Sequence, residues 1–298
     1  MRHMVLAALL WFVPQTAAAP PRPPIIGIAH VRVLAADLAK ARHFYGEVLG
    51  LSELQWDAAG GVGVFAVNQR QRIVVRRGPQ ERDDRLVDVA FATASVTAMR
   101  EWLASRGMQV GSPAADPDGG GRALSLTDPD GHAVLLLETA PLPAPAPASA
   151  AGNALSRRIL HAGLTVKDAA AADKFYKDAL GFSEIWRGGR TEGVTSWINM
   201  RVPDGTDYLE YMLPAPSERP RVEGQSSPSN RRQLGIDHHI ALLVPDIQEA
   251  LERVRERTSP DDPNHRANPQ IGRNNRWQLN LYDPDGTRVE LMEPWTVR

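Results

Sequence analysis

The sequence predicts an α+β fold in which one small supersecondary unit occurs four times and the four units form two domains. Two repeated motifs support this prediction. The segments HFYGEVLGLSEL (43–54) and KFYKDALGFSEI (174–185) match each other at an offset of 131 residues. The turn sequence DPDG occurs at 128–131 and again at 283–286. Repetition of this kind indicates duplicated modules, and 298 residues suffice for two domains that each bury a core.

Each unit begins with an apolar strand that leads into a capped helix. Three of these strands contain a histidine, and an aspartate follows each histidine after seven residues; in the remaining unit, which starts near Asp88, a serine takes the aspartate's place. Aspartate and serine side chains accept hydrogen bonds from the free N–H groups of a first helical turn. We therefore predict a helix start at each of Asp37, Ser95, Asp168 and Asp246.

The second half of each unit reads as antiparallel strands. Both DPDG turns lie between alternating apolar runs, as in RALSL (122–126) before the first turn and HAVLLLE (132–138) after it. Asp-Gly in such a setting predicts a β-hairpin. Each unit is therefore expected to contain a strand, a helix and then two or three antiparallel strands.

The repeats define the domain organisation. The four units fill residues 24–140 and residues 157–298. The segment between them, residues 141–156, is rich in proline, alanine and serine. A segment of this composition is typical of a semi-rigid linker.

The N-terminus predicts a cleaved secretory signal. A basic start is followed by the apolar run Met4–Val13 and by small residues that end at Ala17–Ala19. This order is typical of a signal peptide, so we assign residues 1–23 to a signal and a short tail. The expected location is secreted or periplasmic. No other apolar stretch is long enough to span a membrane.

Composition limits the partners and the chemistry. The formal net charge is -1, which does not favour binding to nucleic acid or to an anionic membrane. The chain has no cysteine, and this excludes disulfides, thiolate ligands and a cysteine nucleophile. We therefore expect a small-molecule substrate and no nucleic-acid partner.

Two His…Glu pairs in the second half of the chain predict a metal site. Glu210 lies 49 residues after His161, and Glu290 lies 51 residues after His239. A carboxylate inside an apolar strand is costly to bury unless a partner compensates its charge. Two imidazoles and two carboxylates suit one divalent ion, such as Zn, Ni, Co, Fe or Mn. A solvated strand face would explain one glutamate, but two glutamates paired with two histidines favour the metal.

The quoted motifs resemble those of the vicinal oxygen chelate superfamily, which includes glyoxalase I, methylmalonyl-CoA epimerase, fosfomycin-resistance proteins and extradiol ring-cleaving dioxygenases. The resemblance rests on the strand histidine with its aspartate, on FY-x3-LG, and on DPDG-x3-E, and it covers nearly the whole mature chain. It implies tandem βαβββ modules, two per domain, that form two cupped, mixed-sheet, glyoxalase-like domains.

Alignment of the modules predicts that only the C-terminal domain holds the metal. The four ligand positions of the N-terminal domain are expected at His30, Val74, Asp88 and Leu135. Apolar side chains offer no lone pair to a cation, so this domain is expected to be degenerate and metal-free. The roles left to it are structural support, a lid or a dimerisation partner, which makes a homodimer one possible assembly.

The ligand set matches that of glyoxalase I, so the resemblance implies a lyase or isomerase. The metal would act as a Lewis acid, and Glu210 and Glu290 would move a proton on a small carbonyl or hydroxy-carbonyl substrate. An extradiol dioxygenase that uses His161, His239 and Glu290 with iron(II) is the alternative. Glu210, and Asn280 at a position where those enzymes carry a tyrosine, count against it. A non-catalytic small-molecule binding protein is a third hypothesis.

Four polar or aromatic residues on two strands are candidates for substrate binding. Trp197 and Asn199 alternate on one strand, as do Gln278 and Asn280 on another, so each pair shares a face. Trp197 would serve equally well as a core residue. Residues 214–237 and 258–276 are expected to be long loops, and loops of such length often act as lids.

Overall fold

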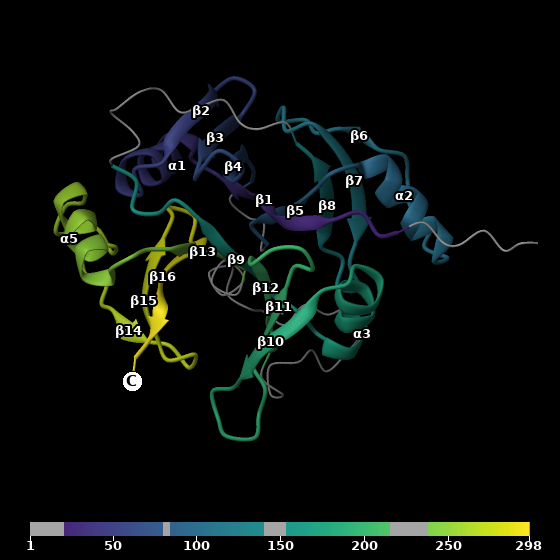
Figure 1. The fold of residues 1–298 in the computed structure, drawn as a ribbon. Helices are drawn as coiled ribbons and strands as arrows, with labels where there is room; N and C mark the ends of the chain where they lie inside the picture. Colours follow the sequence, from purple (N-terminus) through teal and green to yellow (C-terminus); the bar gives the residue numbers. More distant parts are fainter. Residues whose placement is uncertain (1–20, 80–83, 140–152, 215–237, 298) are drawn as a thin grey trace, which may run out of the picture.

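The computed structural model describes residues 21–79, 84–139, 153–214 and 238–297, and over these ranges the chain forms two eight-stranded mixed sheets (Figure 1). The N-terminal sheet consists of β1 (Ile25–Ala35), β2 (Ser52–Asp57), β3 (Val62–Ala66), β4 (Arg72–Arg77), β5 (Leu86–Thr93), β6 (Ala114–Ala115), β7 (Arg122–Thr127) and β8 (Ala133–Glu138). The C-terminal sheet consists of β9 (Ile159–Thr165), β10 (Ser183–Gly188), β11 (Trp197–Arg201), β12 (Tyr208–Met212), β13 (His239–Leu243), β14 (Gln270–Ile271), β15 (Arg276–Tyr282) and β16 (Arg288–Thr296).

The strand orders show the duplication directly. They are β2-β3-β4-β1-β5-β8-β7-β6 and β10-β11-β12-β9-β13-β16-β15-β14. In each sheet the first strands of two modules pair antiparallel at the centre, and each pairs on its other side with the last strand of its own module in parallel. The predicted α+β fold of tandem βαβββ modules is confirmed.

The helices begin where the capping residues predict. They are α1 (Leu38–Arg42), the π-helix η1 (His43–Val48), α2 (Val96–Ser105), α3 (Ala169–Asp173), the π-helix η2 (Lys174–Ala179) and α5 (Ile247–Arg257). All four predicted caps, Asp37, Ser95, Asp168 and Asp246, accept backbone N–H groups of the first turn. The two π-helices coincide with the repeated FY segments, whose period the sequence did not distinguish from an α-helix.

Both DPDG segments form the predicted hairpin turns, because β7 pairs antiparallel with β8 and β15 with β16. These turns also join the two halves of the chain. The hydroxyl of Tyr45 in η1 donates to Asp283 at 3.0 Å, and that of Tyr176 in η2 donates to Asp128 at 2.9 Å. Both tyrosines are fully buried in an apolar core that both sheets share. Each half therefore anchors an FY segment on the DPDG turn of the other half.

The predicted signal, linker and long loops lie outside these helices and strands or only partly within them. The signal segment lies outside the described residues except for 21–23, as does most of the linker and nearly all of 214–237. The segment 258–276 was expected to be a loop, but it contains the edge strand β14, whose two residues are too few to give a periodic signal.

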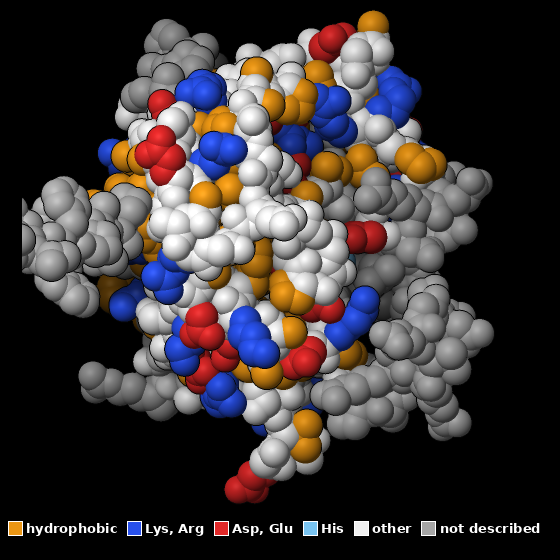
Figure 2. All heavy atoms as spheres, turned by 90° about the vertical axis from the view of Figure 1, so that its right-hand side faces the viewer, with side chains coloured by type: hydrophobic (Ala, Val, Ile, Leu, Met, Phe, Trp, Pro, Cys, Tyr) orange, Lys and Arg blue, Asp and Glu red, His pale blue; other side chains and the backbone are white. Residues whose placement is uncertain are grey.

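The described residues also show the length of the helices and the charge on one face of the molecule. No helix of the described ranges is both long and apolar enough to cross a membrane. Figure 2 shows the face near α2 and α3, where acidic and basic side chains are interspersed. This face therefore offers no continuous basic surface.

Candidate metal centre and active site

The four predicted ligands lie on the four central strands of the C-terminal sheet, β12-β9-β13-β16. Ala241 of β13 pairs with His161 on one side and with Glu290 on the other, and Glu210 of β12 pairs with Gly163 of β9. Alternate residues of a strand share a face, so this register brings side chains distant in sequence onto the same face.

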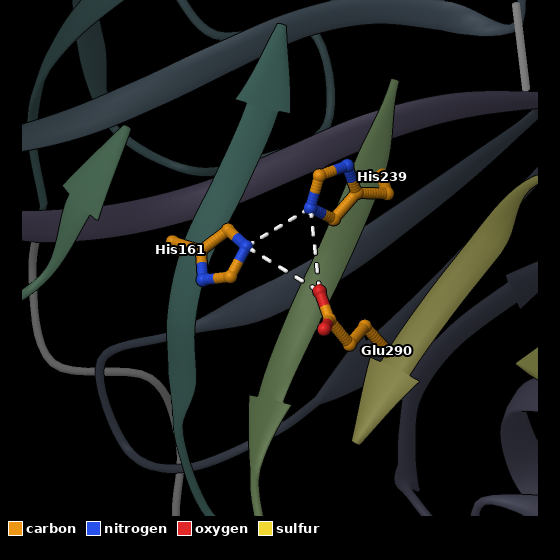
Figure 3. A group of neighbouring side chains, drawn as sticks. All are labelled: His161, His239 and Glu290. Carbon is orange, nitrogen blue, oxygen red and sulfur yellow. Dashed lines mark hydrogen bonds and ion pairs between the residues drawn. The ribbon is translucent and has the colours of Figure 1, made fainter. Parts of the chain in front are cut away.

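Three of the side chains converge from separate strands (Figure 3). Nε2 of His161 lies 2.9 Å from Nε2 of His239. Oε2 of Glu290 lies 3.7 Å from the first nitrogen and 3.5 Å from the second. The ligand atoms of His161, His239 and Glu290 all lie within 4.8 Å of one another, and all three residues are buried.

Glu210 lies beside this group but not within it. Its Oε2 is 3.4 Å from Nε2 of His239, yet the described group of mutually close ligand atoms contains only the other three residues. Its side chain forms part of the wall of an adjacent cavity. The structure thus gives a compact two-histidine, one-glutamate group with a second glutamate at its edge.

The donor set fits a divalent ion. Ligand atoms bound about 2.0–2.2 Å from one ion lie roughly 3.0–3.5 Å apart at tetrahedral or octahedral angles. The observed separations of 2.9, 3.5 and 3.7 Å are close to that range. Imidazole and carboxylate together suit borderline ions such as zinc, iron, cobalt, nickel or manganese. A metal would therefore be held by His161, His239 and Glu290, with Glu210 within reach.

Burial controls the protonation of these groups. It lowers the pKa of His161 well below the usual range, with help from the charges of Arg288 and Arg276, so the imidazole is in its neutral, metal-binding form. Burial, together with the charge of Glu290, raises the pKa of Glu210 to about 8. The pKa of Glu290 is also raised by burial, against the opposing charge of Arg288. Two buried carboxyl groups beside the neutral imidazole of His161 form an environment that favours a cation.

Two further residues shape the centre. Arg288 shares its strand face with Glu290, and its guanidinium donates a 2.8 Å hydrogen bond to Nδ1 of His239. A Cβ built on Gly163 would lie 2.0 Å from the ring of His239. Glycine at this position is therefore required for the imidazole to lie where it does.

A cavity of about 230 Å³ opens beside the ligands. Its wall includes Glu210, Glu290, Arg288 and two of the predicted substrate residues, Trp197 and Gln278. Its remaining lining residues are Trp186, Gln270, Ile271, Gly272, Arg273 and Asn274. A larger cavity of about 440 Å³ lies between residues 154–158 and α5, and its lining contains none of the four ligands. The smaller cavity is therefore the candidate active site.

The other two predicted substrate residues lie next to the ligands rather than in the cavity wall. Asn199 pairs with Glu210 across β11 and β12, and Asn280 pairs with Glu290 across β15 and β16. The Oδ1 atom of each is buried and has no hydrogen-bond partner among the described residues. Both amide side chains therefore lie beside the glutamates on the same face of the sheet. Their contact with substrate stays a prediction.

Sequence reasoning missed Trp186, Arg288 and Gly163 as site residues. Arg288 and Gly163 could have been found from their i±2 spacing, because residues two apart on a strand share a face with Glu290 and His161 respectively. Trp186 had no comparable signal, since a bulge shifts its register between β10 and β11.

The equivalent positions of the N-terminal sheet carry different chemistry. Arg32 pairs with Val74 where Gly163 pairs with Glu210, and Ala90 pairs with Leu135 where Ala241 pairs with Glu290. Nε2 of His30 lies 2.8 Å from Asp88, and Arg32 also binds Asp88 through its guanidinium. The ligand positions there thus hold the predicted His30, Val74, Asp88 and Leu135.

Solved structures with the same fold span nearly the whole chain. The 2,3-dioxygenase LapB from Pseudomonas sp. KL28 is 17% identical, with a TM-score of 0.67 over 92% of this chain and 93% of its own. Homoprotocatechuate 2,3-dioxygenase from Arthrobacter globiformis is 20% identical, with a TM-score of 0.68 over 93% and 82%. A mutant of the Brevibacterium fuscum enzyme is 21% identical, with a TM-score of 0.68 over 92% and 73%. At these identities the likeness establishes the fold alone.

Sequence comparison identifies the family. No curated protein matches the chain. The family model described as Glyoxalase/Bleomycin resistance protein/Dioxygenase superfamily matches twice, at residues 27–136 and 158–291. These two matches correspond to the two sheets and together cover most of the sequence. The chain therefore belongs to the Glyoxalase/Bleomycin resistance protein/Dioxygenase superfamily.

Proposed function

We propose that this protein is a metal-dependent dioxygenase of the extradiol type, which opens a small oxygenated aromatic ring with dioxygen. The observation that carries the proposal is the compact group of His161, His239 and Glu290, with Glu210 outside it. Two histidines and one carboxylate that leave open coordination places are typical of non-haem iron(II) oxygenases. The fold shared with three dioxygenase structures supports the same reading. This reverses the order of the two enzyme classes that the ligand types alone favoured.

The residues around the cavity have distinct roles in this proposal. A bound divalent ion such as iron(II) would supply the Lewis-acid and redox chemistry. His161 and His239 would contribute imidazole ligands, and Glu290 would contribute the anionic ligand. Glu210 lines the cavity at the edge of this group, and the dioxygenase proposal gives it no ligand or proton-transfer role.

A paired comparison of Glu210→Gln and Glu290→Gln tests the proposal. In a dioxygenase that uses the three-residue group, Glu290→Gln should lose metal and turnover, whereas Glu210→Gln should keep its metal and most of its oxygen consumption. Oxygen uptake with 1,2-dihydroxybenzenes and metal content are measured on each purified variant. Wild-type protein that holds iron but consumes no oxygen with any such diol would contradict the proposal.

A glyoxalase-type lyase or isomerase remains the second candidate because of one observation. Glu210 lies 3.4 Å from Nε2 of His239, within reach of both the metal ligands and the cavity, where a general base would act. In that case Glu210 would be both ligand and base, with Glu290 as its partner. Glu210→Gln should then lower turnover of a carbonyl substrate by roughly a hundredfold with the metal retained and without oxygen consumption.

We also propose that the protein is exported, on the basis of the N-terminal apolar run Met4–Val13 and the small residues after it. Export would separate the enzyme from a steady glutathione supply, which disfavours a glutathione-dependent reaction. N-terminal sequencing of protein recovered from the producing cell tests this: a start between about residues 18 and 24 supports export. An intact Met1 would contradict it.

A further inference from the structure

A divalent ion bound by the ligands would give the cavity beside them more positive charge than the chain itself balances. Arg273 and Arg288 both line it, and neither forms an ion pair with a carboxylate among the described residues. Even with Glu210 and Glu290 both ionised, the two arginines offset them, so a divalent ion would leave the cavity with an excess of at least two positive charges. An anionic ligand is the partner that such a site favours.

Arg288 has the clearest need for an acceptor. Its Nε is buried and has no hydrogen-bond partner in the described chain, and the hydrogen bond it donates goes to Nδ1 of His239. A neutral imidazole that binds a metal through Nε2 carries its proton on Nδ1 and cannot accept there. A metal on His239 would therefore release the guanidinium of Arg288 towards the cavity.

The shape of the cavity limits the size and form of the ligand. Its volume of about 230 Å³ is below that of most drug-sized sites but exceeds the roughly 150 Å³ that suffices for benzene. Trp186 and Trp197 provide flat apolar walls. A Cβ on Gly188 would lie 2.4 Å from the ring of Trp186, so glycine there leaves room for the indole.

The mouth of the cavity carries the second arginine. Arg273 is exposed and donates a 2.7 Å hydrogen bond to the carbonyl of Arg190, and Arg190 lies over the ring of Trp197 at 5.6 Å. This contact links the loop after β14 with the loop after β10 at the edge of the cavity. It holds positive charge where a small anion would enter.

We propose that the substrate is a single-ring aromatic anion whose carboxylate pairs with Arg288, while Arg273 adds attraction at the mouth. The inference rests on the proposed function in taking the end of the cavity at Glu290 as the reacting end. Nδ1 and Nε2 of His239 flank Cε1 and point in diverging directions, so Arg288 and the other ligand atoms lie on different sides of the imidazole ring. A single-ring substrate could therefore face the metal ligands with the oxygens at one end and face Arg288 with a carboxylate at the other end.

Binding of benzoate and benzamide tests this inference, because the two probes have nearly the same shape and differ in charge. Affinities are measured without oxygen by calorimetry on the metal-loaded protein. Wild type should bind benzoate more tightly by roughly ten- to hundredfold, the range for a hydrogen bond to a charged group. Arg288→Gln should bring the ratio close to one, and Arg273→Gln should lower it in part. Arg266→Gln, an exposed arginine bonded to the carbonyl of Asp261, is the matched control and should keep the wild-type ratio.

Metal content and thermal unfolding are recorded for every variant, so that a loss of fold or metal is not mistaken for a loss of anion binding. A wild-type ratio near one, or a ratio unchanged in folded and metal-loaded Arg288→Gln, would overturn the inference. Oxygen uptake with catechol and with 3,4-dihydroxybenzoate separates the two proposals. If benzoate binding depends on Arg288 but neither diol causes oxygen uptake, the anion site is supported and the dioxygenase proposal is contradicted. If oxygen uptake and affinity are equal for catechol and 3,4-dihydroxybenzoate, the dioxygenase proposal is supported and the anion site is contradicted.

Discussion

The two sheets place polar residues at equivalent central positions and neutralise them in different ways. In the N-terminal sheet Arg32 follows His30 by two residues, and its guanidinium binds Asp88, Asp116 at 2.5 Å and Asp118 at 2.7 Å. In the C-terminal sheet Gly163 follows His161 by the same interval, and the ring of His239 occupies the space above it. A guanidinium fixed by the chain thus occupies one centre, whereas the other has the ligands for an exchangeable cation.

This difference shows how substitutions at a few equivalent positions of a duplicated module can replace a metal centre with a charge network held within the chain. Arg32 is 4% exposed and its carboxylate partners are similarly buried, so its positive charge is neutralised by ion pairs within the protein. Each of its three guanidinium nitrogens donates to a different carboxylate, so the buried cation is paired within the protein. Gly163 contributes no side chain, which leaves the space that the ring of the ligand His239 occupies in the C-terminal centre.

Loss of a histidine ligand should produce the largest contrast between the two sheets. His239→Ala is expected to lower metal content from about one ion per chain to background and turnover by about a thousandfold or more, because the Lewis acid supplies several kcal/mol. His30→Gln, which retains a polar group near Asp88, should keep both. Elemental analysis and activity are measured together. Equal metal loss in the two variants would show that the N-terminal sheet also contributes to the site.

The next largest effect is expected from Arg32→Met. This change leaves three buried carboxylates without their shared cation, and breaking a buried ion pair in this way costs about 3–5 kcal/mol. Urea unfolding should show that loss while metal content per folded chain stays at the wild-type level. Arg76→Met, which removes a half-buried partner of Asp118 alone, should cost less. A stability near that of wild type for Arg32→Met would mean that the network adds little beyond what apolar packing supplies.

Gly163→Ala should affect the other sheet at the same position. The added methyl group lies 2.0 Å from the ring of His239, so the imidazole must move. We expect metal affinity to fall by roughly 10–100-fold, the range for changes that misorient a ligand. Competition with a chelator measures it. Ala162→Gly, one residue earlier on the opposite strand face, controls for strand flexibility and should leave metal affinity unchanged.

The smallest contrast concerns the two hydrogen bonds that join the halves. Burial raises the pKa of Asp283 to about 6. For Asp128 burial acts in the same direction, but the hydrogen bond and charge of His132 outweigh it and the pKa is lowered. Thr287 takes the place of His132 in the second turn. The same turn therefore favours a protonated carboxyl in one half and an ionised carboxylate in the other.

Substitution by asparagine should show opposite signs at the two turns. The raised pKa of Asp283 means that its favourable contribution is present below the unfolded-state pKa of about 3.9 and is lost as the pH rises through about 6. Relative to wild type, Asp283→Asn should therefore gain about 2–3 kcal/mol between about pH 3 and pH 7. Asp128 contributes above its unfolded-state pKa, so Asp128→Asn should lose stability over the same interval. Urea unfolding midpoints of both variants and wild type are measured at both pH values. Stability changes of the same sign in the two variants would contradict the opposite pKa shifts of Asp283 and Asp128.

Local sequence determined the modular fold, the helix starts and the hairpins of this protein. The FY repeat, the cap residues such as Asp168 and the DPDG turns act through neighbours a few residues away, so their effect can be read along the chain. The ligand residues were also visible, because strand alternation and near-equal spacing place the two histidines, His161 and His239, at matching positions of two modules, and likewise Glu210 and Glu290. The same alignment put Val74 and Leu135 at the two glutamate positions of the N-terminal domain, where their side chains offer no lone pair to a metal.

Only the tertiary structure decided how those residues act together. The position of Glu210 at the edge of the three-residue group, the hydrogen bond from Arg288 to His239 and the closure of the N-terminal centre by Arg32 depend on register between strands far apart in sequence. A one-residue change of register would reverse each of these faces. The sequence therefore specifies which groups the centre can use, and the packing of adjacent strands specifies which of them meet, because distance and burial set both ligand geometry and charge.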